Sequence, residues 1–105
     1  MFREYIVFNN GEKISVQAGN YLYSTPPEDA DSYTAVEVGN IDHIELPEDW
    51  EDYSDWYEDE PPSGDNFAVY AWVPVQMVLD LVVEKGGIKS GILPPLQVDK
   101  FPNVR

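Results

Sequence analysis

The sequence predicts an α+β domain: a small, mostly antiparallel β-sheet of about five strands, one amphipathic helix in the C-terminal half, and an acidic loop or short helix inserted between strands. Short β-branched and aromatic runs separated by Gly and Asn predict the strands. One longer apolar run, with a polar residue at every fourth position, predicts the helix. A chain of 105 residues has the length of one domain with one core, so residues 1–105 are expected to form a single domain.

The chain is predicted to open with a β-hairpin. Residues 5–8 and 13–17 are rich in β-branched and aromatic side chains, and they flank Asn9-Asn10-Gly11, which tolerates the positive φ of a tight turn. Residues 21–23 predict a third short strand, which ends before two prolines because proline cannot donate a ladder hydrogen bond.

A second hairpin and a central strand are predicted next. Residues 33–38 alternate in polarity, and Gly39-Asn40 separates them from a second apolar run at residues 41–46. Residues 66–73 carry apolar side chains at both alternating sets of positions, which is typical of a strand covered on both faces.

Residues 74–85 are predicted to form the helix. Pro74 suits the first helical position, and Gly86-Gly87 can provide the C-terminal cap. The polar stripe comprises Gln76, Asp80 and Glu84. The expected buried face comprises Val75, Val78, Leu79 and Val82, widened by Met77, Leu81 and Val83. After the helix, residues 88–105 are rich in glycine and proline, which predicts an extended tail along the surface.

The negative charge of the chain is concentrated in one block. Twenty Asp and Glu against six Lys and Arg give a net charge of −14, and residues 28–65 hold fifteen of the acids and no Lys or Arg. Such a block opposes folding by self-repulsion and accelerates association with positively charged partners. It predicts a surface that binds a basic protein. Direct binding to nucleic acid or to a membrane surface is not expected, because the six bases are dispersed.

The rest of the composition indicates a cytoplasmic protein. The absence of cysteine excludes disulfides and thiolate chemistry, and it fits a reducing compartment. The N-terminal residues lack the apolar core of a signal peptide, and no apolar run is long enough to span a bilayer.

No pattern of catalytic or cofactor-binding residues appears. The acids lack the spacing of a calcium-binding loop, so no metal and no cofactor are expected. His43 is the single histidine and is interpreted as a surface residue, because no zinc or triad partners accompany it. Paired catalytic carboxylates need a cleft that separates their pKa values, which acids crowded into one segment do not provide. The chain is therefore not expected to be an enzyme.

The acidic aromatic segment, residues 47–64, is the most specific feature. Residues 45–60 contain nine carboxylates and four aromatic side chains. In a helix, Trp50, Tyr53 and Tyr57 would share one side and anchor it, leaving a ridge of carboxylates toward solvent. Repulsion between like charges and the low helix propensity of Asp oppose this helix, so only docked aromatics can hold it.

This segment predicts a DNA mimic. Carboxylates one helical turn apart lie about 5–6 Å from one another, close to the phosphate spacing along one strand. Such a surface fits a groove lined by Lys and Arg, and rigid aromatics among the acids resemble binding hot spots. The predicted function is non-catalytic inhibition of a DNA-processing or defence enzyme through its basic channel. The predicted partner-binding residues are Glu45, Glu48, Asp49, Trp50, Glu51, Asp52, Tyr53, Asp55, Trp56, Tyr57, Glu58, Asp59 and Glu60.

Three other interpretations stay open at this point. In the first, the acids form a solvated surface that keeps the protein soluble, and the aromatics are core anchors. In the second, the chain is an acidic antitoxin or immunity-like protein that neutralises a basic protein at a site unrelated to nucleic acid. In the third, it is an accessory subunit whose apolar tail, residues 88–98, docks on a larger assembly.

In size and composition the chain resembles the acidic inhibitors that phages and mobile elements use against restriction, CRISPR or other DNA-processing enzymes. The resemblance is one of composition and covers mainly residues 28–65. It implies a role of the anti-restriction or anti-CRISPR type, directed at an enzyme that binds DNA.

Overall fold

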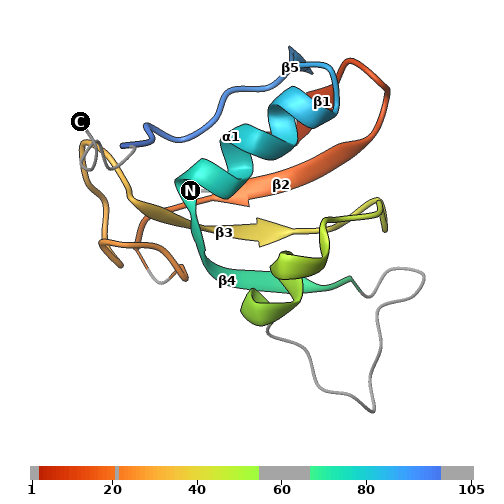
Figure 1. The fold of residues 1–105 in the computed structure, drawn as a ribbon. Coiled ribbons are helices and arrows are strands. Elements are labelled where there is room, and N and C mark those ends of the chain that lie inside the picture. Colours follow the sequence, from red (N-terminus) through yellow and green to blue (C-terminus); the bar gives the residue numbers. More distant parts are fainter. Residues whose placement is uncertain (1–2, 21, 55–66, 98–105) are drawn as a thin grey trace, which may run out of the picture.

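The computed structural model describes residues 3–20, 22–54 and 67–97, and it shows an α+β domain built on one antiparallel sheet (Figure 1). The five strands are β1 (Ile6–Phe8), β2 (Lys13–Gln17), β3 (Ala35–Gly39), β4 (Val69–Pro74) and β5 (Ile88–Ser90), in the spatial order β4-β3-β2-β1-β5. The helix α1 (Val75–Glu84) carries the chain from β4, at one edge, to β5 at the other. A 3₁₀ helix, η1 (Glu48–Tyr53), lies between β3 and β4 in the chain. The predicted fold class is confirmed.

The predicted opening hairpin is present as β1 and β2. Ile6 lies opposite Ile14, and Val7 lies opposite Lys13. Gly11 adopts a φ of +94° at the turn, a conformation that glycine reaches without steric penalty. One face of the hairpin is fully buried, so these two strands form the centre of the core; its side chains are Ile6, Phe8, Ile14 and Val16.

The second predicted hairpin is wrong. β3 pairs with β2 and β4, and residues 41–46 form a turn and an irregular segment instead of a strand. The side chain of Asn40 explains this: its Nδ2 donates to the carbonyl oxygen of Ile44 at 2.9 Å, and its Oδ1 accepts from the amide of Ile44 at 2.9 Å. The two bonds close a loop in which His43 is exposed and has a φ of +51°.

Residues 22 and 23 do not form the third strand that was predicted over residues 21–23. Thr25 makes an isolated antiparallel bridge to Ala35, and the amide of Tyr23 donates to Oε1 of Glu37 at 3.0 Å. Isolated backbone bonds and one side-chain hydrogen bond therefore hold this segment, in place of the continuous ladder of a strand. Tyr21, which belongs to the same prediction, lies outside the described residues.

β4 is an edge strand, whereas the sequence predicted a central one. Val36 lies opposite Val73 and Val38 opposite Tyr70, so Ala71 and Trp72 together face one residue of β3. This bulge shifts the alternation by one residue, which buries both Tyr70 and Val73 and leaves Trp72 51% exposed. The apolar residues that suggested two covered faces are thus divided between the core and the surface.

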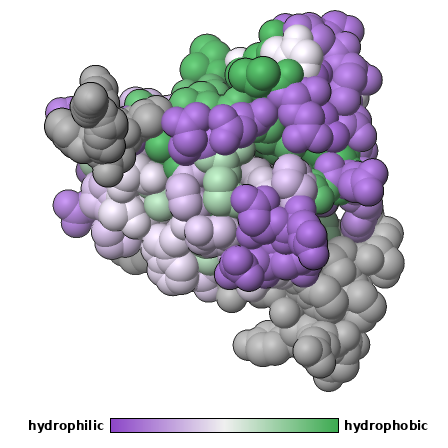
Figure 2. Space-filling model, in the orientation of Figure 1, coloured by the Kyte–Doolittle hydropathy of each residue, from purple (hydrophilic) through white to green (hydrophobic). Residues whose placement is uncertain are grey.

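The predicted helix is confirmed as α1, which packs on the face of the sheet that carries the core (Figure 1). Its buried residues are Val75, Val78 and Leu81. Leu79 and Val82 are only half-buried, and Val83 is 78% exposed, so the buried stripe is narrower than predicted. Apolar surface over α1 is visible in Figure 2. Among the described residues, no helix has the length and apolar character needed to cross a membrane.

The chain after α1 supplies the fifth strand, which corrects the prediction of a purely extended tail. β5 pairs antiparallel with β1, where Ile88 lies opposite Phe8. Farther on, the amide of Tyr33 donates to the carbonyl oxygen of Pro95 at 2.9 Å, and the amide of Gln97 donates to that of Tyr33 at 2.7 Å. The tail is therefore hydrogen-bonded to the domain as far as residue 97, and residues 98–105 lie outside the described part.

Candidate partner-binding surface

The acidic segment begins as the 3₁₀ helix η1, directly after Pro47. The amide of Trp50 donates to the carbonyl oxygen of Pro47 at 3.0 Å, and the amide of Ser54 donates to that of Glu51 at 3.2 Å. Both bonds span three residues, the spacing that defines a 3₁₀ helix. Crowded carboxylates and prolines disfavour an α-helix here, and the tighter single turns form instead.

The 3₁₀ geometry arranges the acids of η1 in two rows. Side chains three residues apart eclipse one another in such a helix, and they lie about 6 Å apart along its axis. Glu48 therefore lies in line with Glu51, and Asp49 in line with Asp52. Trp50 occupies the third side, which faces the core. Two sides of η1 are therefore acidic and face solvent, and the third, apolar side attaches η1 to the core.

Trp50 attaches η1 to the sheet. Its ring is 2% exposed and packs edge-to-face on Tyr70 of β4, with ring centroids 5.6 Å apart and an interplanar angle of 85°. Ser54 then bridges to Tyr70 at the end of η1. For Trp50 the structure thus favours the core-anchor interpretation, and its buried ring is not available to a partner. Tyr53 is half-buried beside it.

Electrostatics link the acidic surface to the core beneath it. Burial raises the pKa of the Tyr70 phenol, and the negative charge of Glu51 raises it further, while a hydrogen bond with Asn40 acts in the opposite direction. The phenol therefore stays neutral at physiological pH.

The described acids of the predicted surface all point to solvent. The exposed members are Glu45, Glu48, Asp49, Glu51 and Asp52. No Lys or Arg of the described residues forms a salt bridge with any of them. Hydrophilic surface covers this part of the molecule in Figure 2. The remaining predicted residues, Asp55, Trp56, Tyr57, Glu58, Asp59 and Glu60, lie outside the described part of the chain.

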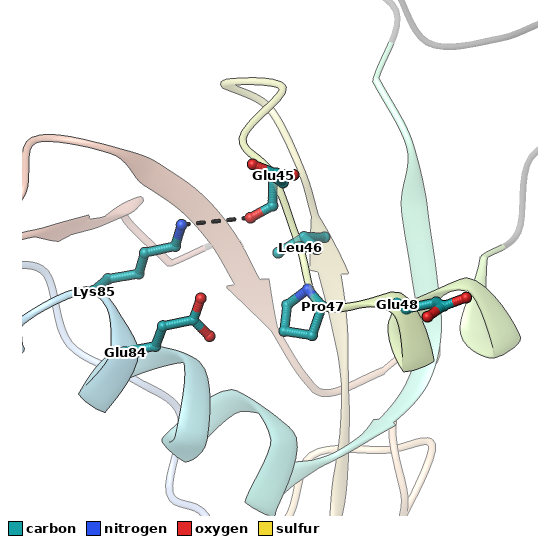
Figure 3. A pocket seen from close by; sticks show the side chains of 6 residues that line it. All are labelled: Glu45, Leu46, Pro47, Glu48, Glu84 and Lys85. Atoms are coloured by element: carbon teal, nitrogen blue, oxygen red, sulfur yellow. Dashed lines mark hydrogen bonds between the residues drawn. The ribbon is translucent and has the colours of Figure 1, made fainter.

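A shallow pocket of about 410 Å³ separates η1 from the end of α1 (Figure 3). Its lining comprises Glu45, Leu46, Pro47, Glu48, Glu84 and Lys85. In Figure 3 the Glu84 carboxylate reaches into the space beside Pro47, whereas the carboxylate of Glu48 points away from it. In the part of the chain that the structure describes, no group of three or more His, Cys, Asp or Glu is placed to hold a metal ion.

Sequence reasoning missed two residues that position the acidic surface. Asn40 closes the loop that leads to η1. Lys85, after α1, places its Nζ 2.9 Å from Oε1 of Glu12 and 3.4 Å from the carbonyl oxygen of Glu45. Its side chain is only 11% exposed, so this ammonium joins the first hairpin, α1 and the segment before η1. The only signal in the sequence for this linking role is the position of Lys85 at the end of the helix, where a positive charge interacts favourably with the last carbonyl groups.

Comparison with known protein families, with curated proteins and with solved structures finds no match to this chain. The acidic surface and its attachment to the core are therefore the features that indicate a function.

Proposed function

We propose that this chain is a non-catalytic inhibitor that acts as a DNA mimic. Its acidic surface occupies the basic nucleic-acid channel of a DNA-processing or defence enzyme in the cytoplasm, as anti-restriction and anti-CRISPR proteins of phages and mobile elements do. The partner is a basic protein, and the chain does not itself bind nucleic acid.

One observation carries this proposal. The acids of η1 are exposed and form no salt bridge with any Lys or Arg of the described residues, yet Trp50 fixes the backbone of η1 to the core. A solubilising surface needs charge but no ordered support, and inert surfaces intersperse both signs. A fixed charged surface loses less conformational entropy on binding than a flexible acidic tail does. The anchoring therefore favours specific binding over general solubility.

The two rows of η1 offer the chemistry of a phosphate backbone. Carboxylates about 6 Å apart along each row can accept hydrogen bonds from Lys and Arg that normally contact successive phosphates. Occupying that groove displaces the same counterions as DNA does, so binding should weaken steeply with salt. We place residues 55–60 in the same surface on the basis of their sequence alone.

The direct test neutralises the two rows. A variant carrying Glu48→Gln, Asp49→Asn, Glu51→Gln and Asp52→Asn should lose about 2–4 kcal/mol of binding free energy, or about 30- to 1,000-fold in Kd, because close interfacial charge pairs are removed. Its Kd should also depend less on salt. The partner is first captured on the immobilised protein from a nuclease-treated bacterial lysate, and Kd is then measured by calorimetry across a salt series.

A matched variant controls for total charge. Glu4→Gln, Glu28→Gln, Asp31→Asn and Asp80→Asn also remove four exposed acids, but none of them lies in η1. This control should retain nearly full affinity. Equal losses in both variants would mean that net charge alone drives binding, and unchanged affinity in the η1 variant would refute the proposal.

Elution separates mimicry from the antitoxin alternative. Duplex DNA should release a retained nucleic-acid enzyme, because the inhibitor and DNA need the same channel. A retained partner that DNA does not displace would instead support neutralisation at an unrelated site. The accessory-subunit alternative has less support, because β5 and the bonds of Gln97 attach much of the tail to its own domain.

A further inference from the structure

The backbone of β4 is strained at Trp72. This residue has a φ of +52°, in the left-handed region that bulky side chains rarely adopt. For a residue other than glycine, that conformation is sterically unfavourable, because the Cβ atom lies too close to the backbone carbonyl oxygen. It coincides with the bulge opposite Glu37, and bulges frequently redirect a side chain near a functional site. The strain turns a large apolar ring outward, which brings no benefit to the core.

The exposed ring of Trp72 belongs to an ordered cluster with Tyr23 and Glu37. The rings of Tyr23 and Trp72 have centroids 4.9 Å apart at an interplanar angle of 40°, and they are 40% and 51% exposed. The amide of Trp72 donates to the carbonyl oxygen of Tyr23 at 3.2 Å, and the amide of Tyr23 donates to Oε1 of Glu37 at 3.0 Å. Hydrogen bonds on both sides of Tyr23 therefore hold the cluster in place.

This cluster lies on the face of the sheet opposite α1. Glu37 stands between Val36 and Val38, which are both fully buried in the core that α1 covers. Because side chains alternate along a strand, Glu37 points to the other face. Two exposed aromatic rings beside a carboxylate thus occupy a sheet face that no described helix covers.

We propose that Tyr23, Glu37 and Trp72 form a binding site for an arginine side chain of the basic protein partner. A guanidinium can stack on the indole face of Trp72 while it donates to the Glu37 carboxylate, which accepts more than one hydrogen bond. Arginine fits better than lysine because its planar group can stack and donate at once. The inference rests on the proposed function for the basic character of the partner, in keeping with the net charge of −14.

β4 connects this site to the acidic surface. Tyr70 of β4 holds Trp50 of η1 on the core side, and Trp72, two residues farther along, displays its ring on the opposite face. A partner that binds around the β4 edge of the sheet contacts the acids of η1 on the core face and the Trp72 cluster on the opposite face. The Trp72 cluster then makes binding specific, because charge attraction alone would not distinguish one basic protein from another.

The site can be tested on the protein by itself with a short peptide. Acetyl-Gly-Ser-Arg-Ser-Gly-amide, and the same peptide with lysine in place of arginine, are titrated into ¹⁵N-labelled protein. The indole N–H of Trp72 and the amide of Tyr23 should shift, with affinity about fivefold higher for the arginine peptide. Glu37→Gln should weaken the response by a similar factor.

Two variants at one position separate binding from folding. Trp72→Ala and Trp72→Gly should both abolish the peptide-induced shift of the Tyr23 amide. Trp72→Gly should leave the stability of the protein unchanged or higher, because glycine accepts the φ of +52°. Tyr5→Ala, which removes another exposed aromatic ring, should respond like the unaltered protein. Equal affinity for the two peptides, or shifts that persist without the Trp72 ring, would overturn the inference.

The variant with four neutralised acids in η1 distinguishes this inference from the proposed function. It should retain the peptide response, since Glu37 and both rings are intact. If its response vanishes, the peptide was bound by η1 and the arginine site is refuted. If the peptide response is retained but the captured partner binds this variant as well as the unaltered protein, the proposed function fails and the arginine site stands.

Discussion

At the scale of single residues, two tryptophans in one small domain have opposite roles. Trp50 is buried against Tyr70 and fixes the acidic 3₁₀ helix, whereas Trp72 is held outward by a strained backbone. Both lie in runs rich in aromatic side chains, and the sequence does not distinguish them. The difference arises from the bulge in β4, which changes which residues of that strand face the core.

Removing the Trp50 ring should unfold η1 and weaken the whole domain. Trp50→Ala leaves a large cavity next to Tyr70, so we expect it to lower the free energy of unfolding by about 3–5 kcal/mol in a urea titration. Trp72→Gly is the matched control and should not destabilise. A change below about 1 kcal/mol for Trp50→Ala would show that the ring is not the anchor inferred from its burial.

Asn40 should prove essential to the loop that precedes η1. Asn40→Ala removes both side-chain bonds to Ile44 at a buried position, and we expect a loss of about 1–3 kcal/mol in stability. Asn40→Asp keeps an acceptor for the Ile44 amide, but it places a buried negative charge against the carbonyl oxygen of Ile44, so its loss at neutral pH should be at least as large. Hydrogen exchange at the Ile44 amide reports the loop directly. Unchanged protection of that amide in Asn40→Ala would contradict this account.

At the scale of elements, local patterns were predictable and long-range pairing was not. The first hairpin and α1 follow from turn residues and helical spacing that act within a few positions. The second hairpin failed because the Asn40 side chain competes for the backbone of its own loop, which polarity alternation does not reveal. β5 was missed because its three residues gain order only by pairing with β1, far away in the sequence.

The candidate site was predictable in composition but not in shape. Residues 48–53 were recognised as acidic and aromatic, but whether they would be a loop or a helix depended on the docking of Trp50. The sequence pattern did not indicate the exposed cluster around Trp72, because a tryptophan side chain in an alternating strand is usually buried in the core. Its exposure depends on a bulge for which the sequence contains no glycine marker.

The ion pair between Lys85 and Glu12 connects elements in a pH-dependent way. The hydrogen bond from Lys85, together with one from Asn10, holds the pKa of Glu12 below its usual range near 4.5. A depressed carboxylate pKa stabilises the fold above that range and loses the effect as pH falls through the folded-state value. The contribution should be at most about 1 kcal/mol, because Glu12 is partly exposed.

Thermal melting checks this linkage. Glu12→Gln should lower Tm slightly at pH 7, and the difference from the unaltered protein should shrink toward zero at pH 3. Lys89→Met serves as control, because Lys89 is exposed and forms no salt bridge within the described ranges. A Tm difference that is the same at both pH values would mean that Glu12 acts through packing and not through its charge.

At the scale of the whole molecule, the fold supports an unbalanced charge. A net charge of −14 on 105 residues destabilises the compact state by self-repulsion, and the sheet with α1 provides the buried apolar surface that offsets it. The excess negative charge is concentrated in residues 28–65, and within that block the buried ring of Trp50, with Tyr53 and the Ser54 bridge beside it, attaches η1 to the core. We interpret the domain as a rigid platform that presents acids to a basic groove.

The measurement that tests this account most directly is a competition isotherm. The Kd of the captured enzyme for this protein is determined at increasing concentrations of duplex DNA. If both occupy one channel, the apparent Kd should rise in proportion to the DNA concentration without reaching a limit. A Kd that DNA leaves unchanged, or that reaches a plateau because both bind together, would contradict DNA mimicry.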